Sequence, residues 1–433
     1  LEDASIDQVF RNVRAEVLTQ TDGTQRPVEA TQLTGNTFYL NKKTMIDEII
    51  EINDLYNDFR YIDAYNLYEK YFYDTPENLK AIELEINLLL KLEKYEIALE
   101  KLNKHLKNYK NSDIVYFLAY KVSLALKDFD LALFYISEAL KINSENSDYY
   151  SASTYANYKL YFSKNKDKFS RAAAKNMDQI NDLIKKNETP INHYNLAYNS
   201  YLTDNLNLFI KSADRSLEYG LNDSHMLSKL INCSLYFMLN IDLHENQKIT
   251  DKIQIIVPKI ITYSINTFPS NYSFYLDFAE WKMGENNEAL ELVNIAYEID
   301  PYNIRVRELR GKVLYNIAYD CLNKETDSEA VELDNSECNE FAYNAISDLI
   351  FVTERSSNLG VYNVLGRIHF FILKDEEEKA IEYFKKSNSN FWKIQQYISD
   401  AYKILKDYNK STEFLDKAFK NLEDVSVENV IKI

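Results

Sequence analysis

One arrangement of apolar residues recurs three times between residues 59 and 146. In each copy an aromatic residue stands three positions before an alanine, and a large apolar residue follows the alanine by four positions. The copies have a period of 34 residues and comprise Tyr61, Ala64 and Tyr68; Tyr95, Ala98 and Leu102; and Phe129, Ala132 and Ile136. Residues three and four apart share one face of an α-helix, so each copy predicts a helix with one apolar face.

The alanine and the repeat length together predict stacked helical hairpins. A small side chain lets two helix axes approach to about 8–10 Å, so each alanine marks the point where the second helix of a hairpin crosses the first. A single hairpin cannot bury its apolar face, and neighbouring hairpins must therefore stack. This pattern resembles the tetratricopeptide (TPR) repeat, and the resemblance implies a solenoid whose first helices line a concave groove for a peptide or a protein.

The pattern continues less regularly after residue 146. Phe169 and Ala172 take the aromatic and alanine places of the fourth copy, after an insertion within residues 158–168. Leu206 and Phe209 hold the same places in the fifth copy, now without the alanine. We therefore expect two further hairpins here, with longer helices or turns than in the first three.

The remaining chain also has helical spacing. Residues 222–272 lose the period, and we interpret them as degenerate helical hairpins. The period returns at the turn, crossing, packing and closing positions Gly284, Ala289, Val293, Ala296 and Pro301, and two further copies lie around Ala380 and Ala418. Residues 323–340 are acidic and interrupt the array as an exposed loop. The sequence thus predicts a TPR-like helical repeat domain over residues 59–433.

Residues 1–40 have a different pattern. A capping box begins at Ser5, and an apolar stripe of helical spacing follows at Ile6, Val9, Phe10, Val13 and Val17. A turn at residues 21–24 and a short aromatic strand at residues 36–40 come next. One helix and one strand cannot fold alone, so we expect this segment to dock on another polypeptide or on residues upstream. Residues 41–58 form a linker and the start of the first repeat.

This segment resembles the C-terminal end of a caspase-like (metacaspase-type) peptidase domain. One extra residue between Gly35 and Phe38 departs from the family pattern. The matching residues are Phe10, Val13, Arg14, Val17, Gly23, Gln25, Pro27, Leu33, Gly35, Phe38, Tyr39 and Leu40. The implied fold is mostly α, a TPR-type α-solenoid preceded by a short helix-loop-strand that completes a caspase-like α/β domain. Because the chain begins at Leu1 and not at Met, we expect it to be a fragment or a processed product.

The resemblance implies the C-terminal portion of a cysteine endopeptidase whose TPR domain binds a regulatory partner or a protein substrate. The family includes bacterial immune proteases, some of which work with CRISPR complexes and some of which activate gasdermins. Its catalytic His and Cys lie upstream of the matching segment, so we assign no catalytic residue to this chain. The alternative is a non-enzymatic TPR scaffold whose N-terminal arm docks on another protein.

The histidines and cysteines of this chain do not form a recognisable dyad. His225 and Cys233 lie eight positions apart, which places them about 12 Å apart along a helix. We interpret the histidines (His105, His193, His225, His244 and His369) as surface or packing residues, and the cysteines (Cys233, Cys321 and Cys338) as small apolar core residues.

The composition of the chain limits the classes of partner and cofactor that we expect. The 433 residues carry a formal charge of −17, which disfavours nucleic acid and anionic membrane as ligands and favours a basic partner surface. The scattered cysteines indicate a reducing compartment, with no disulfide scaffold and no zinc site, and we expect a cytoplasmic protein without a cofactor. Four acidic residues in the 323–340 loop could hold a metal, but they lack the glycine of a calcium loop: Asp327, Glu329, Glu332 and Asp334.

The groove of the predicted solenoid is harder to assign. Ile86 and Tyr120 stand where TPR repeats usually keep a small residue, so large groups either alter the packing of the first helices or fill the groove. Four polar residues of the first helices are candidates to face the groove, although all could equally be solvated surface: Asn87, Lys91, Lys121 and Asn157.

Overall fold

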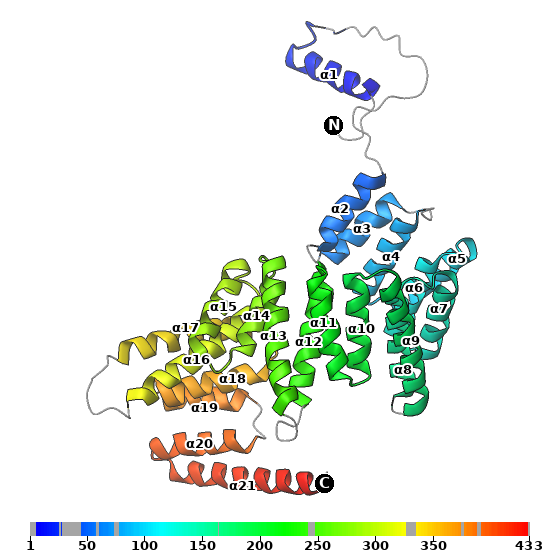
Figure 1. Ribbon diagram of the computed structural model, residues 1–433. Helices are drawn as coiled ribbons and strands as arrows, with labels where there is room; N and C mark the ends of the chain where they lie inside the picture. The colour runs from blue at the N-terminus through cyan, green and yellow to red at the C-terminus, as the bar shows by residue number, and fades with distance from the viewer. Residues whose placement is uncertain are drawn as a thin grey trace. The chain divides into compact units, whose positions relative to one another are not determined.

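The computed structural model consists of helices and their connections (Figure 1). It describes residues 6–25, 27, 45–57, 60–72, 78–162, 164–240, 247–325, 335–373, 376–387 and 391–431. Within these ranges there is no β-strand, and the predicted strand at residues 36–40 lies outside them. The chain divides into two compact units, Leu1–Asn205 and Leu206–Ile433.

Unit 1 contains ten helices in the described residues. After the N-terminal helix α1, they form antiparallel hairpins in chain order, and α10 packs against α8 and α9. The helices are α1 (Ile6–Gln20), α2 (Met45–Asn57), α3 (Tyr61–Tyr71), α4 (Leu79–Lys91), α5 (Tyr95–Asn108), α6 (Asp113–Ala125), α7 (Phe129–Ile142), α8 (Ser147–Tyr161), α9 (Lys166–Lys186) and α10 (Pro190–Leu202).

Unit 2 begins with α11 and continues as five hairpins within the described residues. The helices are α11 (Leu206–Glu218), α12 (Ser224–Asn240), α13 (Gln247–Thr267), α14 (Tyr272–Trp281), α15 (Asn286–Ile299), α16 (Ile304–Glu325), α17 (Asn335–Thr353), α18 (Leu359–Arg367), the π-helical turn η1 (Ile368–Ile372), α19 (Glu377–Lys386), α20 (Trp392–Ile404) and α21 (Tyr408–Ile431). We call the first helix of each hairpin the A helix and the second the B helix.

The alanines lie where the sequence predicts a close crossing. Ala64, Ala98 and Ala132 have no exposed surface, and the large residues that follow them by four positions are also fully buried. The residues stack into continuous clusters, as a hairpin with one apolar face requires. The hairpins are TPR-like, and the prediction of a helical solenoid is confirmed.

Charged residues end the A helices where glycine is the usual choice. Glu93 and Lys127 have φ angles of 57° and 60°, in the left-handed region. The amide of the next residue closes each helix by bonding back to a carbonyl five residues earlier, from Lys94 to Leu89 and from Asp128 to Ser123, both at 2.9 Å. This use of polar residues at the left-handed position accounts for a helical array with only seven glycines.

The two stretched copies exchange large and small residues. In α5 and α7 the fourth residue of the helix is the buried alanine and the eighth is a large apolar residue. In α9 the fourth residue is Phe169 and the eighth is Ala173, both buried, while Ala172 is only half-buried. The prediction that Ala172 is the small buried residue of this copy is therefore wrong by one position, since Ala173 is the buried alanine. The Phe169 ring packs edge-on against Tyr158 and Phe162, each with ring centroids 5.7 Å apart.

Helix α11 repeats this exchange. Its fourth residue is Phe209 and its eighth is Ala213, and both have no exposed surface. The expectation of a copy without its alanine is thus corrected, because the alanine is present one turn later. Within residues 222–272 the described part is mainly helical as predicted, and α12 and α13 pack as a hairpin whose second helix contains Pro258.

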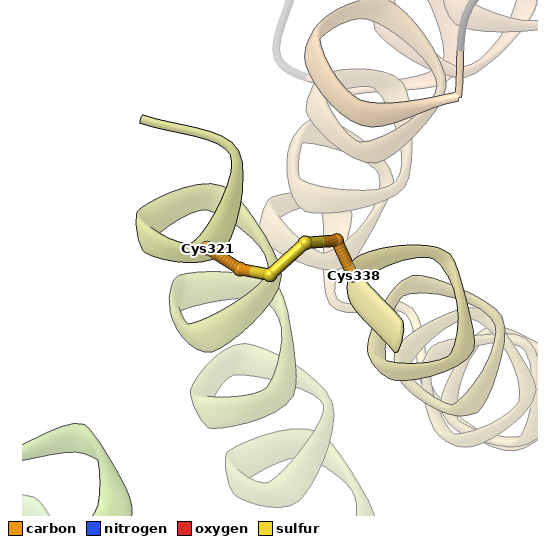
Figure 2. Close-up of a disulfide and its surroundings, with 2 residues drawn as sticks. All are labelled: Cys321 and Cys338. Carbon is orange, nitrogen blue, oxygen red and sulfur yellow. A yellow bond between two sulfur atoms is a disulfide. The ribbon is translucent and has the colours of Figure 1, made fainter. Parts of the chain in front are cut away.

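The prediction that the chain has no disulfide is wrong for one pair. Cys321 on α16 and Cys338 on α17 are bonded, with Cα atoms 5.8 Å apart (Figure 2). They are 17 positions apart in sequence, and the antiparallel hairpin brings them opposite each other. Cys233 is free and buried, as expected of a core residue. The four acidic residues considered for a metal lie outside the described residues, in 326–334.

The N-terminal helix forms where the sequence predicts it. Helix α1 begins at Ile6, and a turn follows in which Asp22 and Gly23 have φ angles of 46° and 74°. Phe10 and Val13 on its apolar stripe are 43 % and 51 % exposed. Residues 28–44 lie outside the described part, so the domain boundary at residue 40 stays a prediction.

Candidate protein-binding face of unit 1

The A helices of unit 1 present one face on which residues of successive repeats lie side by side. Contacts across this face join α6 to α8, since the Tyr120 hydroxyl donates to the Ala152 carbonyl at 3.1 Å and the Tyr149 hydroxyl to Asp113 at 3.0 Å. Helix α4 packs against α6, and α8 against α10. We define the A-helix face of unit 1 by Glu83, Asn87, Phe117, Lys121, Asp148 and Tyr155, which come from α4, α6 and α8.

Lys121 occupies the middle of this face. Its side chain is half-buried, and burial lowers the pKa of its ammonium although the carboxylates of Glu83 and Asp148 act in the opposite direction. The ammonium lies 4.9 Å from the centre of the Phe117 ring. It makes no ion pair within the described residues. A partly desolvated ammonium with spare donors can bind a carbonyl or carboxylate oxygen of a partner.

The other predicted groove residues have different surroundings. Lys91 is exposed, with its ammonium 5.8 Å from the centre of the Tyr61 ring, and Asn87 is half-buried on the same helix. Asn157 is only 6 % exposed and donates to the Ser153 carbonyl at 2.8 Å. Asn157 is thus part of the helix packing, and the structure gives it no groove position.

The large residues at the usual small position fill the space between helices. Ile86 has no exposed surface, and Tyr120 is 5 % exposed. The Tyr120 ring stacks on Phe117 with centroids 5.6 Å apart, and burial raises the pKa of its hydroxyl. These residues therefore alter the packing of the A helices, which was one of the two predicted outcomes.

An asparagine ladder fixes α10 against α8, and sequence reasoning missed it. The Asn195 side-chain amide donates to Ser147 at 2.9 Å and to Asp148 at 2.7 Å, and that of Asn199 donates to Ser151 at 2.7 Å. Both asparagines are buried. Their spacing of four residues, on a helix without charged residues, was the available signal. The ladder holds Asp148 in place beside Lys121.

A cavity of about 540 Å³ opens near the ends of α8 and α10. Its lining includes Asn146 and Thr189, whose side chains cap the first turns of these helices by accepting from Asp148 and Asn192 amides. The side-chain oxygens of Asn146 and Thr189 are thus already used in capping.

Carboxylates lie beside three histidines of the described residues. His105 lies 3.3 Å from buried Glu85, His193 lies 2.9 Å from Glu188, and His369 contacts Glu376. His225 lies on α12, and His244 lies outside the described residues. These placements fit the interpretation of histidines as packing residues for His105, His193 and His369, which are buried.

The free thiol is unsuited to nucleophilic attack. Burial raises the pKa of Cys233 to about 12, although the ammonium of Lys229 acts in the opposite direction. An activated cysteine has the opposite shift, because the thiolate is the nucleophile. Across the described residues no group of three or more His, Cys, Asp or Glu side chains could hold a metal ion. None of the described helices is long and apolar enough to cross a membrane.

No protein-family model and no curated protein matches the sequence. Among solved structures, a thermophilic TPR protein of Thermus thermophilus is 17 % identical over 44 % of this chain and 100 % of that one, with a TM-score of 0.36. The C-terminal part of a TPR repeat-containing protein of Cytophaga hutchinsonii is 16 % identical over 60 % and 93 %, with a TM-score of 0.38. Human IFIT1 is 14 % identical over 86 % and 81 %, with a TM-score of 0.40. The chain's own stacked hairpins make it a TPR-like α-solenoid.

Proposed function

We propose that this chain is the partner-binding, C-terminal portion of a caspase-like cysteine endopeptidase. The TPR-like array binds a regulatory partner or a protein substrate, and α1 with the segment after it completes the peptidase domain. The catalytic His and Cys belong to residues upstream of Leu1. The proposal includes a role in bacterial immune defence, by resemblance to the immune proteases of that family.

The exposure of Phe10 and Val13, two residues of the apolar stripe of α1, is the observation that carries this proposal. Phe10 and Val13 are 43 % and 51 % exposed, although both belong to the residues that resemble the end of a caspase-like domain. An isolated helix of 15 residues is only marginally stable in water, and tertiary packing of its apolar face supplies most of its stability. A peptidase sheet docked on this face would supply that packing.

The A-helix face of unit 1 supports partner binding. Lys121 offers ammonium donors without an ion pair in the described residues, Phe117 offers aromatic surface beside it, and Tyr155 adds a half-buried ring on α8. Glu83 and Asp148 add carboxylate acceptors on either side. Such a mixture fits a polypeptide with both charged and aromatic groups. Binding here would act on the peptidase domain only by favouring one of its conformations.

A cytoplasmic location remains part of the proposal. In a reducing cytoplasm the Cys321–Cys338 pair would be a dithiol for much of the protein's lifetime, because glutathione and thioredoxin keep thiols reduced. The pair would then form under oxidising conditions or after cell lysis. Rapid alkylation during lysis of the native host measures its state in the cell.

The second candidate is a non-enzymatic scaffold whose N-terminal arm docks on another protein. The exposed side chains of Phe10 and Val13 on α1 fit this candidate as well, because any partner protein with an apolar surface could cover them. In this case the partner of α1 carries no peptidase dyad.

Mass spectrometry of intact protein from the native host distinguishes the two. The protease proposal predicts either a longer continuous chain or an upstream fragment bound to this one, and in both cases a His…Cys dyad in the upstream part. If an upstream fragment is bound, F10D/V13D releases it, whereas R11E, which changes a residue off the stripe, does not. A stable chain of 50.9 kDa that binds no such fragment contradicts the protease proposal.

A further inference from the structure

Three consecutive A helices of unit 2 bring three tyrosines and one arginine together. Tyr315 and Tyr319 come from α16, Arg367 from α18 and Tyr397 from α20. The Arg367 guanidinium carbon lies 4.9 Å from the centre of the Tyr315 ring, and the rings of Tyr315 and Tyr319 are 6.0 Å apart. Burial raises the pKa of Tyr315 to about 12, Arg367 opposes this, and Tyr319 and Tyr397 add to it. We call these four residues and Asn363 the Arg367 cluster.

Several polar atoms of the cluster are buried without a partner. Tyr315 is 4 % exposed, and its hydroxyl makes no hydrogen bond among the described residues. The same holds for Nε of Arg367 and for Oδ1 of Asn363, which lies one helical turn before Arg367. Buried polar groups are nearly always hydrogen-bonded in folded proteins. Two of these atoms, the Tyr315 hydroxyl and Arg367 Nε, are donors on neighbouring side chains, and they indicate a place that an acceptor group of a ligand completes.

Arg367 differs from the other arginines of this part of the fold. Arg307 and Arg310 both bond to the fully buried carboxylate of Asp348, at 2.7 and 2.6 Å. Arg305 pairs with Asp277 at 3.0 Å. Arg367 is half-buried like the first two, yet it has no ion pair within the described residues. In a chain with 67 acidic and 50 basic residues, a half-buried arginine without an acidic partner is unusual.

We propose that the Arg367 cluster binds a carboxylate group of a partner polypeptide. The planar guanidinium matches a carboxylate with two parallel hydrogen bonds, and the tyrosine hydroxyls can donate to the same group. A single guanidinium balances a single negative charge. A doubly charged phosphate would keep one unbalanced negative charge, and the carboxylate of Asp320, which acts on Tyr315, would repel it. The cluster therefore favours a carboxylate over a phosphate.

Aromatic rings next to the cluster determine what can flank the carboxylate. The Phe371 ring packs edge-on against Tyr319 at 6.0 Å and against Tyr397 at 5.3 Å. These aromatic rings favour an apolar or aromatic residue next to the acidic residue of the bound polypeptide. The site lies in unit 2 and shares no residue with the A-helix face of unit 1 or with α1, so it goes beyond the proposed function and can fail or hold separately.

Binding of matched peptide pools to the full chain tests this site. The probes are degenerate octapeptides with amidated C-termini, one pool with a fixed central Glu and one with a fixed central Gln, and a third pool with the central Gln and a free C-terminal carboxylate. Immobilised protein is incubated with equal amounts, and retained peptides are counted by mass spectrometry. The intact protein should retain the Glu pool or the free-carboxylate pool about tenfold more than the amidated Gln pool, as one charge-assisted hydrogen-bond pair provides. Which of the two is retained identifies a side-chain or a terminal carboxylate.

Three variants locate the preference. R367Q should abolish it, and Y315F, which keeps the ring under Arg367 and removes the hydroxyl, should reduce it by about threefold. R355Q is the matched control, because Arg355 is exposed, stacks on Phe351 at 3.9 Å and pairs with Glu354. Equal retention of all pools by the intact protein overturns the proposal, as does a preference that survives in R367Q. If circular dichroism shows R367Q to be misfolded, an unchanged preference in Y315F overturns it instead.

Discussion

Reduction of the Cys321–Cys338 bond should loosen one hairpin of unit 2 and leave its neighbours unchanged. The bond joins α16 to α17 near the ends of both helices that face residues 326–334. Because the two cysteines are 17 positions apart, the bond restricts the unfolded hairpin as well as holding the folded one. A reducing agent or the C321A/C338A double variant removes this restriction.

The expected magnitude follows from the loop length. Closing a loop of this size lowers the entropy of the unfolded chain, which stabilises the folded hairpin by about 3 kcal/mol at 25 °C. Every 1.4 kcal/mol corresponds to about a tenfold change in an equilibrium constant, so the opening of α16 and α17 should become about a hundredfold more frequent on reduction. In a repeat array each hairpin contacts only its neighbours, so the effect should stay local.

Hydrogen exchange of the full chain measures this effect, helix by helix. Peptides from α16 and α17 should exchange about a hundredfold faster after reduction, while peptides from α4 and α5 serve as internal controls. Reduction should change nothing in C321A/C338A. Exchange of α16 and α17 that is the same before and after reduction refutes the reasoning, as does alkylation of three thiols instead of one when the oxidised protein is unfolded.

Three further changes have expected results. K121A should weaken capture of the native partner by about tenfold, as loss of one charge-assisted hydrogen bond does. K104A, which changes an exposed lysine, is the control and should leave capture unchanged. Equal capture by both variants would show that Lys121 does not contribute to binding. Burial lowers the pKa of His369 in the folded state despite its bond to Glu376. Unit 2 should therefore lose stability as the pH falls through about 6.5, because the unfolded histidine then takes up a proton that the folded one does not. Denaturant unfolding from pH 7.5 to 5 should show this loss, and H369Q should reduce it. G366A should destabilise unit 2 by about 1–2 kcal/mol, because its added Cβ would lie 2.6 Å from the fully buried Phe384 ring, whereas G284A has open space and should be close to neutral in thermal unfolding.

The regular part of the fold could be predicted because its information is local. Ala98 and Leu102 lie four apart on one helix face, and the same spacing recurs with the next hairpin, so the pattern alone identifies both the helix and its stacking. The stretched copies could not be aligned in the same way. Phe169 and Ala173 exchange the large and small positions, and a search for an alanine at fixed distance from an aromatic residue then selects Ala172.

Contacts between helices account for what was missed. The Cys321–Cys338 bond depends on the register of α16 against α17, which no single-helix pattern specifies. The Asn195 and Asn199 ladder depends in the same way on α8 and α10, since polar residues on a helix read as surface until a neighbour covers them. Lys121 was identified as a groove candidate, but its partial burial follows from packing of α4, α6 and α8.

Hydrogen exchange of residues 6–20 in protein isolated from its native host tests the central claim most directly. If α1 closes a caspase-like domain, its amides should be protected as strongly as those of the buried hairpins, because Phe10 and Val13 would be covered by the peptidase sheet. Exchange of this helix at the rate of an unstructured peptide, in material that retains every native partner, would contradict the account.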